Sequence, residues 1–292
     1  MKSVSGAPDV SGFFDDATNT ISYVVADPAT NACAIIDSLL DYDQASGRTS
    51  TASAEKLVEF VSARNLSVEW IIDTHVHADH LTAAPFLREK LGGRIAIGER
   101  IADVQKVFAE IFNEGQSFHT DGSQFDHLFK DGETYELGSI KAIALHTPGH
   151  TPACMSHLIG DALFVGDTVF MPDFGTARCD FPGGDAGQLY DSIQTLFALP
   201  DETRMFLCHD YKAPGRDEFV WETSVGAQKR ENIHVGGGVA RDDFIKMRTA
   251  RDATLAMPQL ILPSVQINMR AGEMPPPEEG GKRFIKIPIN GL

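Results

Sequence analysis

Residues 75–80 have the sequence H-V-H-A-D-H, which places three imidazoles and one carboxylate within six positions. An apolar run at 68–73 ends where the histidines begin, and residues 81–91 have the spacing of an amphipathic helix. We therefore expect a loop between a strand and a helix, where scaffolds commonly present functional groups. A surface cluster of histidines is the alternative, but it does not explain this placement. The segment predicts a transition-metal site at which the chemistry is done.

The spacing within the segment suits one or two metal ions. His75 and His77 are two residues apart, so on an extended segment they can converge on one ion. Asp79 and His80 then point to a neighbouring position, about 3.5–4 Å away in two-metal sites. Four side chains of this one loop are therefore candidate ligands.

Three later segments supply further candidates. His150 lies in T-P-G-H-T-P (147–152), Asp167 in F-V-G-D-T (164–168), and His209 in L-C-H-D-Y (207–211). Each follows an apolar run that predicts a strand. Separate strands can bring such residues to one edge of a sheet, so we expect them to join the histidines of the first loop.

Strands and helices alternate along the chain, but many strands adjoin one another through tight turns. This pattern favours two mixed sheets faced by helices over a doubly wound parallel sheet. From about residue 215 the pattern changes: one helical stretch is predicted near 225–232, followed by irregular segments and short strands with several prolines. We expect no separate helical domain there.

Composition excludes some partners. The net charge of −16 argues against nucleic acid, whose phosphates require basic surfaces. No window approaches the roughly 20 apolar residues of a membrane-spanning helix. The four cysteines contain no C-x-x-C pair, which favours free thiols and a cytoplasmic location. A small anionic ligand held by a few local arginines remains compatible with this charge.

The order H-x-H-x-D-H, T-P-G-H-T, G-D and H-D-Y resembles the metallo-β-lactamase superfamily over residues 13–211. The resemblance implies an αβ/βα sandwich, an α+β fold with two mixed sheets flanked by helices. It implies one domain over 1–292, with a core at 13–211 and a packed extension at 212–292. It also implies that the metal ligands come from a set of seven residues: His75, His77, Asp79, His80, His150, Asp167 and His209.

Residues 175–181, the tail segment 265–272 and the tyrosine of H-D-Y resemble the persulfide dioxygenases within this superfamily. That likeness implies one Fe²⁺ per chain and oxidation of glutathione persulfide by O₂ to sulfite and glutathione. The implied iron ligands are His75, His150 and Asp167. His77, Asp79, His80 and His209 would then hydrogen bond to the ligands or to iron-bound water, with Asp79 and His209 taking part in catalysis.

The alternative is a thioester hydrolase of the glyoxalase II type, which would use the same seven residues to hold two ions, commonly Zn²⁺. A metal- or redox-sensing binding protein is a third interpretation. Arg178 is the predicted contact for a glutathione carboxylate, because a guanidinium binds a carboxylate through two parallel hydrogen bonds. Tyr211 is a second predicted substrate contact. Longer loops at 39–51 and 112–129, which we expect near the site, depart from the simplest members of the family. A homodimer is a further expectation.

Overall fold

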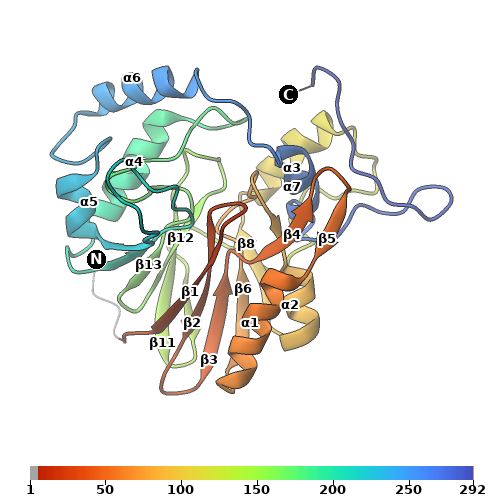
Figure 1. Cartoon of the computed structure of the whole chain (residues 1–292), viewed down its shortest axis with the longest axis horizontal. Coiled ribbons are helices and arrows are strands. Elements are labelled where there is room, and N and C mark those ends of the chain that lie inside the picture. Colours follow the sequence, from red (N-terminus) through yellow and green to blue (C-terminus); the bar gives the residue numbers. More distant parts are fainter. Residues whose placement is uncertain (1–5, 292) are drawn as a thin grey trace.

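The computed structural model describes residues 6–291 and contains two six-stranded mixed sheets packed face to face (Figure 1). The first has the order β1 (Asp9–Asp15), β2 (Thr20–Ala26), β3 (Ala32–Ile36), β6 (Ser67–Ile72), β8 (Arg94–Gly98), β9 (His127–Phe129). The second has the order β10 (Thr134–Leu137), β11 (Ile140–His146), β12 (Met155–Ile159), β13 (Ala162–Phe164), β14 (Arg204–Phe206), β15 (Glu222–Ser224). A small third sheet joins β4 (Leu39–Asp43), β5 (Arg48–Ser50) and β7 (Leu81–Thr82).

Helices cover the outer face of each large sheet. The first sheet is covered by α1 (Ala52–Ala63), α2 (Ala84–Leu91) and α3 (Ile101–Ile111). The second is covered by α4 (Ala186–Phe197) and α5 (Val225–Glu231), and α6 (Arg241–Asp252) packs on α4. The short helix α7 (Ile261–Asn268) packs against β7. This arrangement confirms the predicted α+β fold with two mixed sheets flanked by helices.

Successive side chains of the central strands enter different cores because a strand has a side-chain period of two. In β2, Val24 packs beneath the helices of the first sheet, whereas Tyr23 and Val25 fill the space between the two sheets. In β12, Leu158 faces α4, while Met155 packs between the sheets. Both faces of these strands are buried, which explains why they appear in the sequence as continuous apolar runs.

The prediction for the tail is wrong in one respect. Beyond α5, the segments expected to be irregular or to form short strands contain the helices α6 and α7. The apolar signal of α6 is weak because only Phe244, Arg248 and Asp252 are buried, and two of these are charged. Lack of helix in the tail therefore no longer argues against a hydrolase.

Two predictions from the sequence concern membrane-spanning helices and the state of the cysteines. Across residues 6–291, no helix is both long enough and apolar enough to cross a membrane. All four cysteines are buried, and each carries a free thiol.

Asp27 connects the turns of the two large sheets at the end opposite the metal-ligand loops. Its carboxylate accepts hydrogen bonds from N and Oγ of Ser139, both at 2.7 Å, from Thr30 Oγ1 at 2.8 Å and from Ala29 N at 2.9 Å. Burial raises the pKa of Asp27, but these hydrogen bonds outweigh it and lower the pKa to about 2.

We expect Asp27→Asn to lower the free energy of unfolding by roughly 1–3 kcal/mol at pH 7, because hydrogen bonds to the charged carboxylate are lost. The folded-state pKa lies below the unfolded value of about 4, so this contribution is complete above pH 4 and is lost as the pH falls toward 2. Urea unfolding of both proteins across that range measures it. Asp16→Asn, at an exposed position, serves as the control. A constant difference from pH 7 to pH 2 would contradict the assignment.

Candidate metal centre and its cleft

Loops from both large sheets meet at one edge and carry all seven predicted ligand residues. Residues 75–80 follow β6 of the first sheet. His150 follows β11, Asp167 follows β13 and His209 follows β14, all in the second sheet. The structure thus brings together residues that lie up to 134 positions apart in sequence (209 minus 75).

Two glycines allow these loops to pass close to their neighbours. Gly149, with φ +139°, lies so near Leu189 of α4 that a Cβ atom would come within 2.3 Å of its backbone. Gly166, with φ +49°, would place a Cβ atom 2.4 Å from Oγ1 of Thr74. A larger residue at either position would displace the ligand that follows it.

The three-residue cluster consists of His75, His150 and Asp167, all buried, with candidate ligand atoms within 4.8 Å of one another. Nδ1 of His150 donates to the carbonyl oxygen of Arg178 at 2.8 Å, which leaves a lone pair on Nε2, 3.7 Å from Asp167. Oγ1 of Thr74 donates its proton to the carboxylate of Asp37 at 3.0 Å. In the contact of 3.1 Å between Thr74 and His75, Nδ1 of His75 is therefore the donor. Both imidazoles are therefore held with Nε2 available for a metal.

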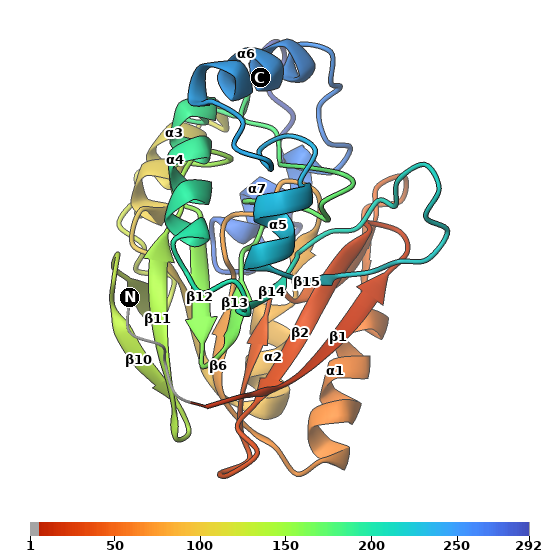
Figure 2. The same ribbon diagram turned by 90° about the vertical axis from the view of Figure 1, so that its left-hand side faces the viewer.

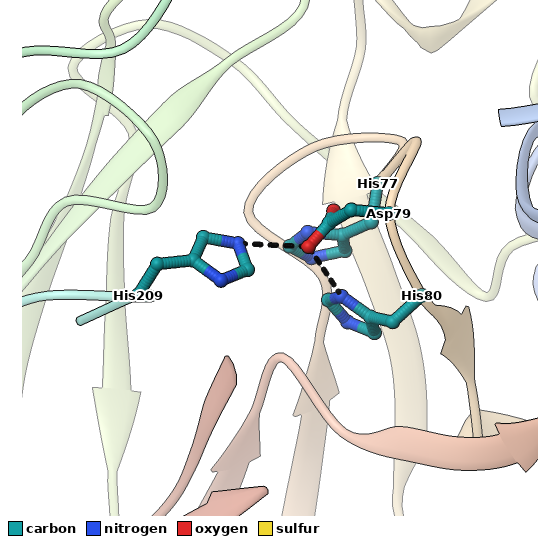
Figure 3. A group of neighbouring side chains, drawn as sticks. All are labelled: His77, Asp79, His80 and His209. Carbon is teal, nitrogen blue, oxygen red and sulfur yellow. Dashed lines mark ion pairs between the residues drawn. The ribbon is translucent and has the colours of Figure 1, made fainter. Parts of the chain in front are cut away.

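The four-residue cluster consists of His77, Asp79, His80 and His209 (Figure 3), and its candidate ligand atoms also lie within 4.8 Å of one another. Oδ2 of Asp79 lies 3.2 Å from Nε2 of His209 and 3.6 Å from Nδ1 of His80. The two clusters adjoin, because Nε2 of His209 is also 3.3 Å from Oδ1 of Asp167.

Asp37 is a site residue that the sequence analysis did not select. It is buried at the end of β3, where it accepts hydrogen bonds from Nε2 of His77 at 2.9 Å and from N of Thr74 at 2.7 Å. Burial lowers the pKa of His77, but the carboxylate of Asp37 outweighs it and raises the pKa to about 9. Metal binding to Nδ1 of His77 would therefore release a proton.

Buried atoms without partners show that this donor set suits a metal ion. Within residues 6–291, six side-chain atoms of the two clusters are buried and make no hydrogen bond: Nε2 of His75, His80 and His209, Nδ1 of His77, and one oxygen each of Asp79 and Asp167. Burial, with neighbouring histidines, keeps the pKa of His75 well below its usual value, so its imidazole is neutral. Neutral imidazoles and carboxylates are the ligands that zinc, iron and similar ions prefer.

Asn268 at the end of α7 holds the ligand loop from the far end of the chain. Its Nδ2 donates to the carbonyl oxygens of His77 at 2.9 Å and His80 at 2.8 Å. Its Oδ1 accepts from the backbone N of Thr82 at 2.9 Å. The tail segment 265–272, singled out from the sequence, therefore contributes directly to the shape of the metal centre.

A cleft of about 730 Å³ opens onto both clusters through Asp79, His150 and Asp167. Its walls carry aromatic rings, the β4–β5 hairpin and the segment that joins α6 to α7, and α6 itself lies at one end of the molecule (Figure 2). Nε2 of Gln44 at the hairpin tip donates to the carbonyl oxygen of Gln259 at 3.0 Å, so the hairpin and this linker touch. Of the two loops expected near the site, 39–51 thus forms part of the cleft wall, whereas the prediction for 112–129 is wrong because none of its residues lines the cleft.

Both predicted substrate contacts line this cleft. The ring of Tyr211 is 41% exposed and packs on Phe174, with ring centres 5.1 Å apart. Arg178 donates from Nε to Asp180 at 2.6 Å and from Nη1 to the carbonyl oxygen of Ala256 at 2.6 Å. A substrate carboxylate would therefore have to displace an internal partner of Arg178, and its role stays a prediction.

Arg248 and Asp252 fix the wall from behind, and no sequence motif pointed to them. Nε of Arg248 donates to Oδ1 of Asp252 at 2.8 Å, and both residues are buried. Nη1 of Arg248 donates to the carbonyl oxygen of Thr176, and Oδ2 of Asp252 accepts from N of Cys179 at 2.8 Å. Their spacing of four residues on one helix is the only signal that the sequence offered.

Comparison with known proteins gives both a family and a range of activities. The model of the metallo-beta-lactamase superfamily matches residues 16–209. A probable metallo-hydrolase of Burkholderia pseudomallei is 54% identical over 97% of this chain and 99% of that protein. Glyoxylase B2 of Dictyostelium discoideum is 49% identical over 92% of each. A mitochondrial persulfide dioxygenase of Bos taurus is 26% identical over 94% of this chain and 92% of that protein.

Among solved structures, ETHE1 from Myxococcus xanthus superposes with a TM-score of 0.72 and 31% identity, covering 91% of this chain and 100% of that one. Persulfide dioxygenase relatives carry the same ETHE1 name. The relatives of higher sequence identity carry hydrolase or glyoxylase names instead. Comparison therefore supports a metal-dependent enzyme and leaves the choice of reaction to the chemistry of the centre.

Proposed function

Because the chain belongs to the metallo-β-lactamase superfamily, we propose that it is a persulfide dioxygenase with one iron ion held by His75, His150 and Asp167. The observation that carries this proposal is the composition of the three-residue cluster: two imidazoles and one carboxylate, buried at the floor of an open cleft. Two histidines and one carboxylate on one face of an ion are typical of non-haem iron oxygenases. When bound, iron supplies a redox centre at which a sulfur anion and O₂ can bind side by side.

The four-residue cluster supports the same chemistry without a second ion. Burial raises the pKa of Asp79, but its neighbours His209 and His80 outweigh it and hold the pKa of this carboxyl well below its usual value, so Asp79 is a carboxylate without a second ion. Nδ1 of His209 donates to the carbonyl oxygen of Asn19 at 3.2 Å, which holds its Nε2 at 3.2 Å from Asp79. Asp79 lines the cleft, and its carboxylate can accept the proton that a persulfide loses on binding.

The overall reaction is balanced by water. Both atoms of O₂ and one oxygen of water join the terminal sulfur of glutathione persulfide, the S–S bond breaks, and glutathione, sulfite and two protons leave. Phe170, Phe174 and Phe181 line the cleft and limit the entry of further water toward the ligands. The volume of the cleft, about 730 Å³, is within the range of sites that bind drug-sized ligands. A cleft of this size suits a tripeptide carrier.

A metal-dependent thioester hydrolase is the second candidate, favoured by a specific observation. Nδ1 of His77 and Nε2 of His80 and His209 are buried without hydrogen bonds in the four-residue cluster, as a second metal would require. The hydrolase-named relatives have the higher sequence identity. The seven residues would then hold two ions, which would supply an activated water for attack on the thioester.

Oxygen consumption tests the proposal. We expect the iron-loaded protein to consume one O₂ per sulfite formed from glutathione persulfide, and to leave S-lactoylglutathione intact. An oxygen electrode measures the O₂ consumed, and sulfite analysis of the same sample measures the product formed. Hydrolysis of the thioester without oxygen uptake would replace the proposal by the second candidate.

A further inference from the structure

Three arginines line the wall of the cleft, and they differ in how their charges are balanced. The guanidinium of Arg178 faces Asp180 through two nitrogen–oxygen contacts of 2.6 Å. Arg248 is buried and pairs with Asp252. Arg251 is exposed, and within residues 6–291 its side chain makes neither an ion pair nor a hydrogen bond. Only the charge of Arg251 is therefore uncompensated among these three.

This free charge is located where the outer part of a substrate would lie. Arg251 is in the last turn of α6, next to the linker residues Leu255 and Gln259 that form the same wall. The metal ligands His150 and Asp167 line the cleft as well, so one molecule in it faces both features. The chain carries a net charge of −16, so an anion is repelled unless a local cation offsets that field.

We propose that Arg251 binds a carboxylate of the thiol carrier and so selects anionic thiol peptides over neutral thiols. This inference rests on the proposed function only in placing the carrier's sulfur at the metal ligands; it holds equally for a persulfide and for a thioester. Arg251 meets a carboxylate without losing a protein partner, whereas Arg178 would have to exchange Asp180 for it. Arg178 and Arg248 then hold the wall in place.

Binding of a non-reacting carrier tests this directly. The probe is S-methylglutathione, which is neither a persulfide nor a thioester, titrated calorimetrically into the metal-loaded protein. We expect Arg251→Gln to weaken binding about tenfold, as for loss of a charge-assisted hydrogen bond, and Arg251→Lys to recover part of it. Lys246→Gln removes the same charge from an exposed position of α6 outside the cleft and should bind as the unaltered protein does.

A second probe identifies the substrate group involved. The dimethyl ester of S-methylglutathione lacks both carboxylates and should bind the unaltered protein about tenfold more weakly than the acid. In Arg251→Gln, acid and ester should bind alike, because the interacting pair is already broken. Equal binding of acid and ester by the unaltered protein, or equal binding of the acid by Arg251→Gln, would overturn the inference.

These outcomes are independent of the reaction catalysed. If glutathione persulfide elicits no oxygen uptake while the acid–ester difference still depends on Arg251, the dioxygenase proposal fails and this inference stands. If oxygen uptake occurs with unchanged KM in Arg251→Gln, the inference fails and the dioxygenase proposal stands. With both correct, Arg251→Gln raises KM about tenfold and leaves kcat unchanged, as expected for a contact made equally in ground and transition states.

Discussion

Asp167→Ala is expected to reduce bound metal from about one ion per chain to a small fraction of that, and to abolish oxygen uptake. The substitution removes the only carboxylate of the three-residue cluster and leaves His75 and His150 to hold a cation without a compensating charge. Replacing mere outer partners of metal ligands typically costs 10–100-fold in affinity, so loss of a ligand should cost at least about a hundredfold. Elemental analysis of the purified variant measures it.

A matched control separates this effect from general destabilisation. His119 is exposed and lies outside both clusters, so His119→Ala should keep its metal and its activity. The thermal unfolding of metal-free Asp167→Ala should be close to that of the metal-free unaltered protein. Stoichiometric iron in Asp167→Ala would show that the ligand assignment is wrong.

Exchange of iron for zinc is expected to have an equally large effect. Protein stripped by a chelator and reloaded with Fe²⁺ should regain oxygen uptake, whereas the same protein loaded with Zn²⁺ should show none above background. Zinc suits the donor set but has no redox chemistry, so it cannot mediate electron transfer from sulfur to O₂. Metal content and oxygen uptake are measured on the same preparations.

The zinc-loaded sample also tests the competing reaction. Two zinc ions per chain with rapid hydrolysis of S-lactoylglutathione would identify the four-residue cluster as a second metal site. One ion per chain and no hydrolysis is the outcome that the dioxygenase proposal requires. Oxygen uptake by zinc-loaded protein equal to that of iron-loaded protein would contradict the mechanism outright.

The seven ligand candidates were predictable from sequence because each lies in a loop that follows an apolar strand. Strand ends are easily located, and parallel or adjacent strands deliver their following residues to a common edge. The predicted fold followed from the same strands, with alternate residues such as Tyr23 and Val24 entering different cores. At these positions, the residues that the local sequence pattern selects also lie close together in the folded protein.

Other contributors have no local pattern. Asp37 also follows a strand, but its importance depends on His77, forty residues away. Nε2 of His77 donates a hydrogen bond to its carboxylate. Helix α6 was missed because its buried face contains Arg248 and Asp252, which satisfy each other only once the helix has formed. Arg251 stands out only by comparison with the paired arginines beside it. Such features depend on partners that a sequence pattern does not reveal.

Because Asn268 lies far beyond the ligand loop in the chain, the order of synthesis decides when this loop can take its final shape. Its side chain fixes the backbone of His77 and His80 from 191 and 188 residues further along the chain. All seven ligand candidates are therefore synthesised before this clamp can form. Before that point the nascent chain contains the candidate ligand residues, but the backbone of His77 and His80 is not yet held by Asn268. A chain that ends before Asn268 is therefore expected to hold a metal ion more weakly than one that contains it.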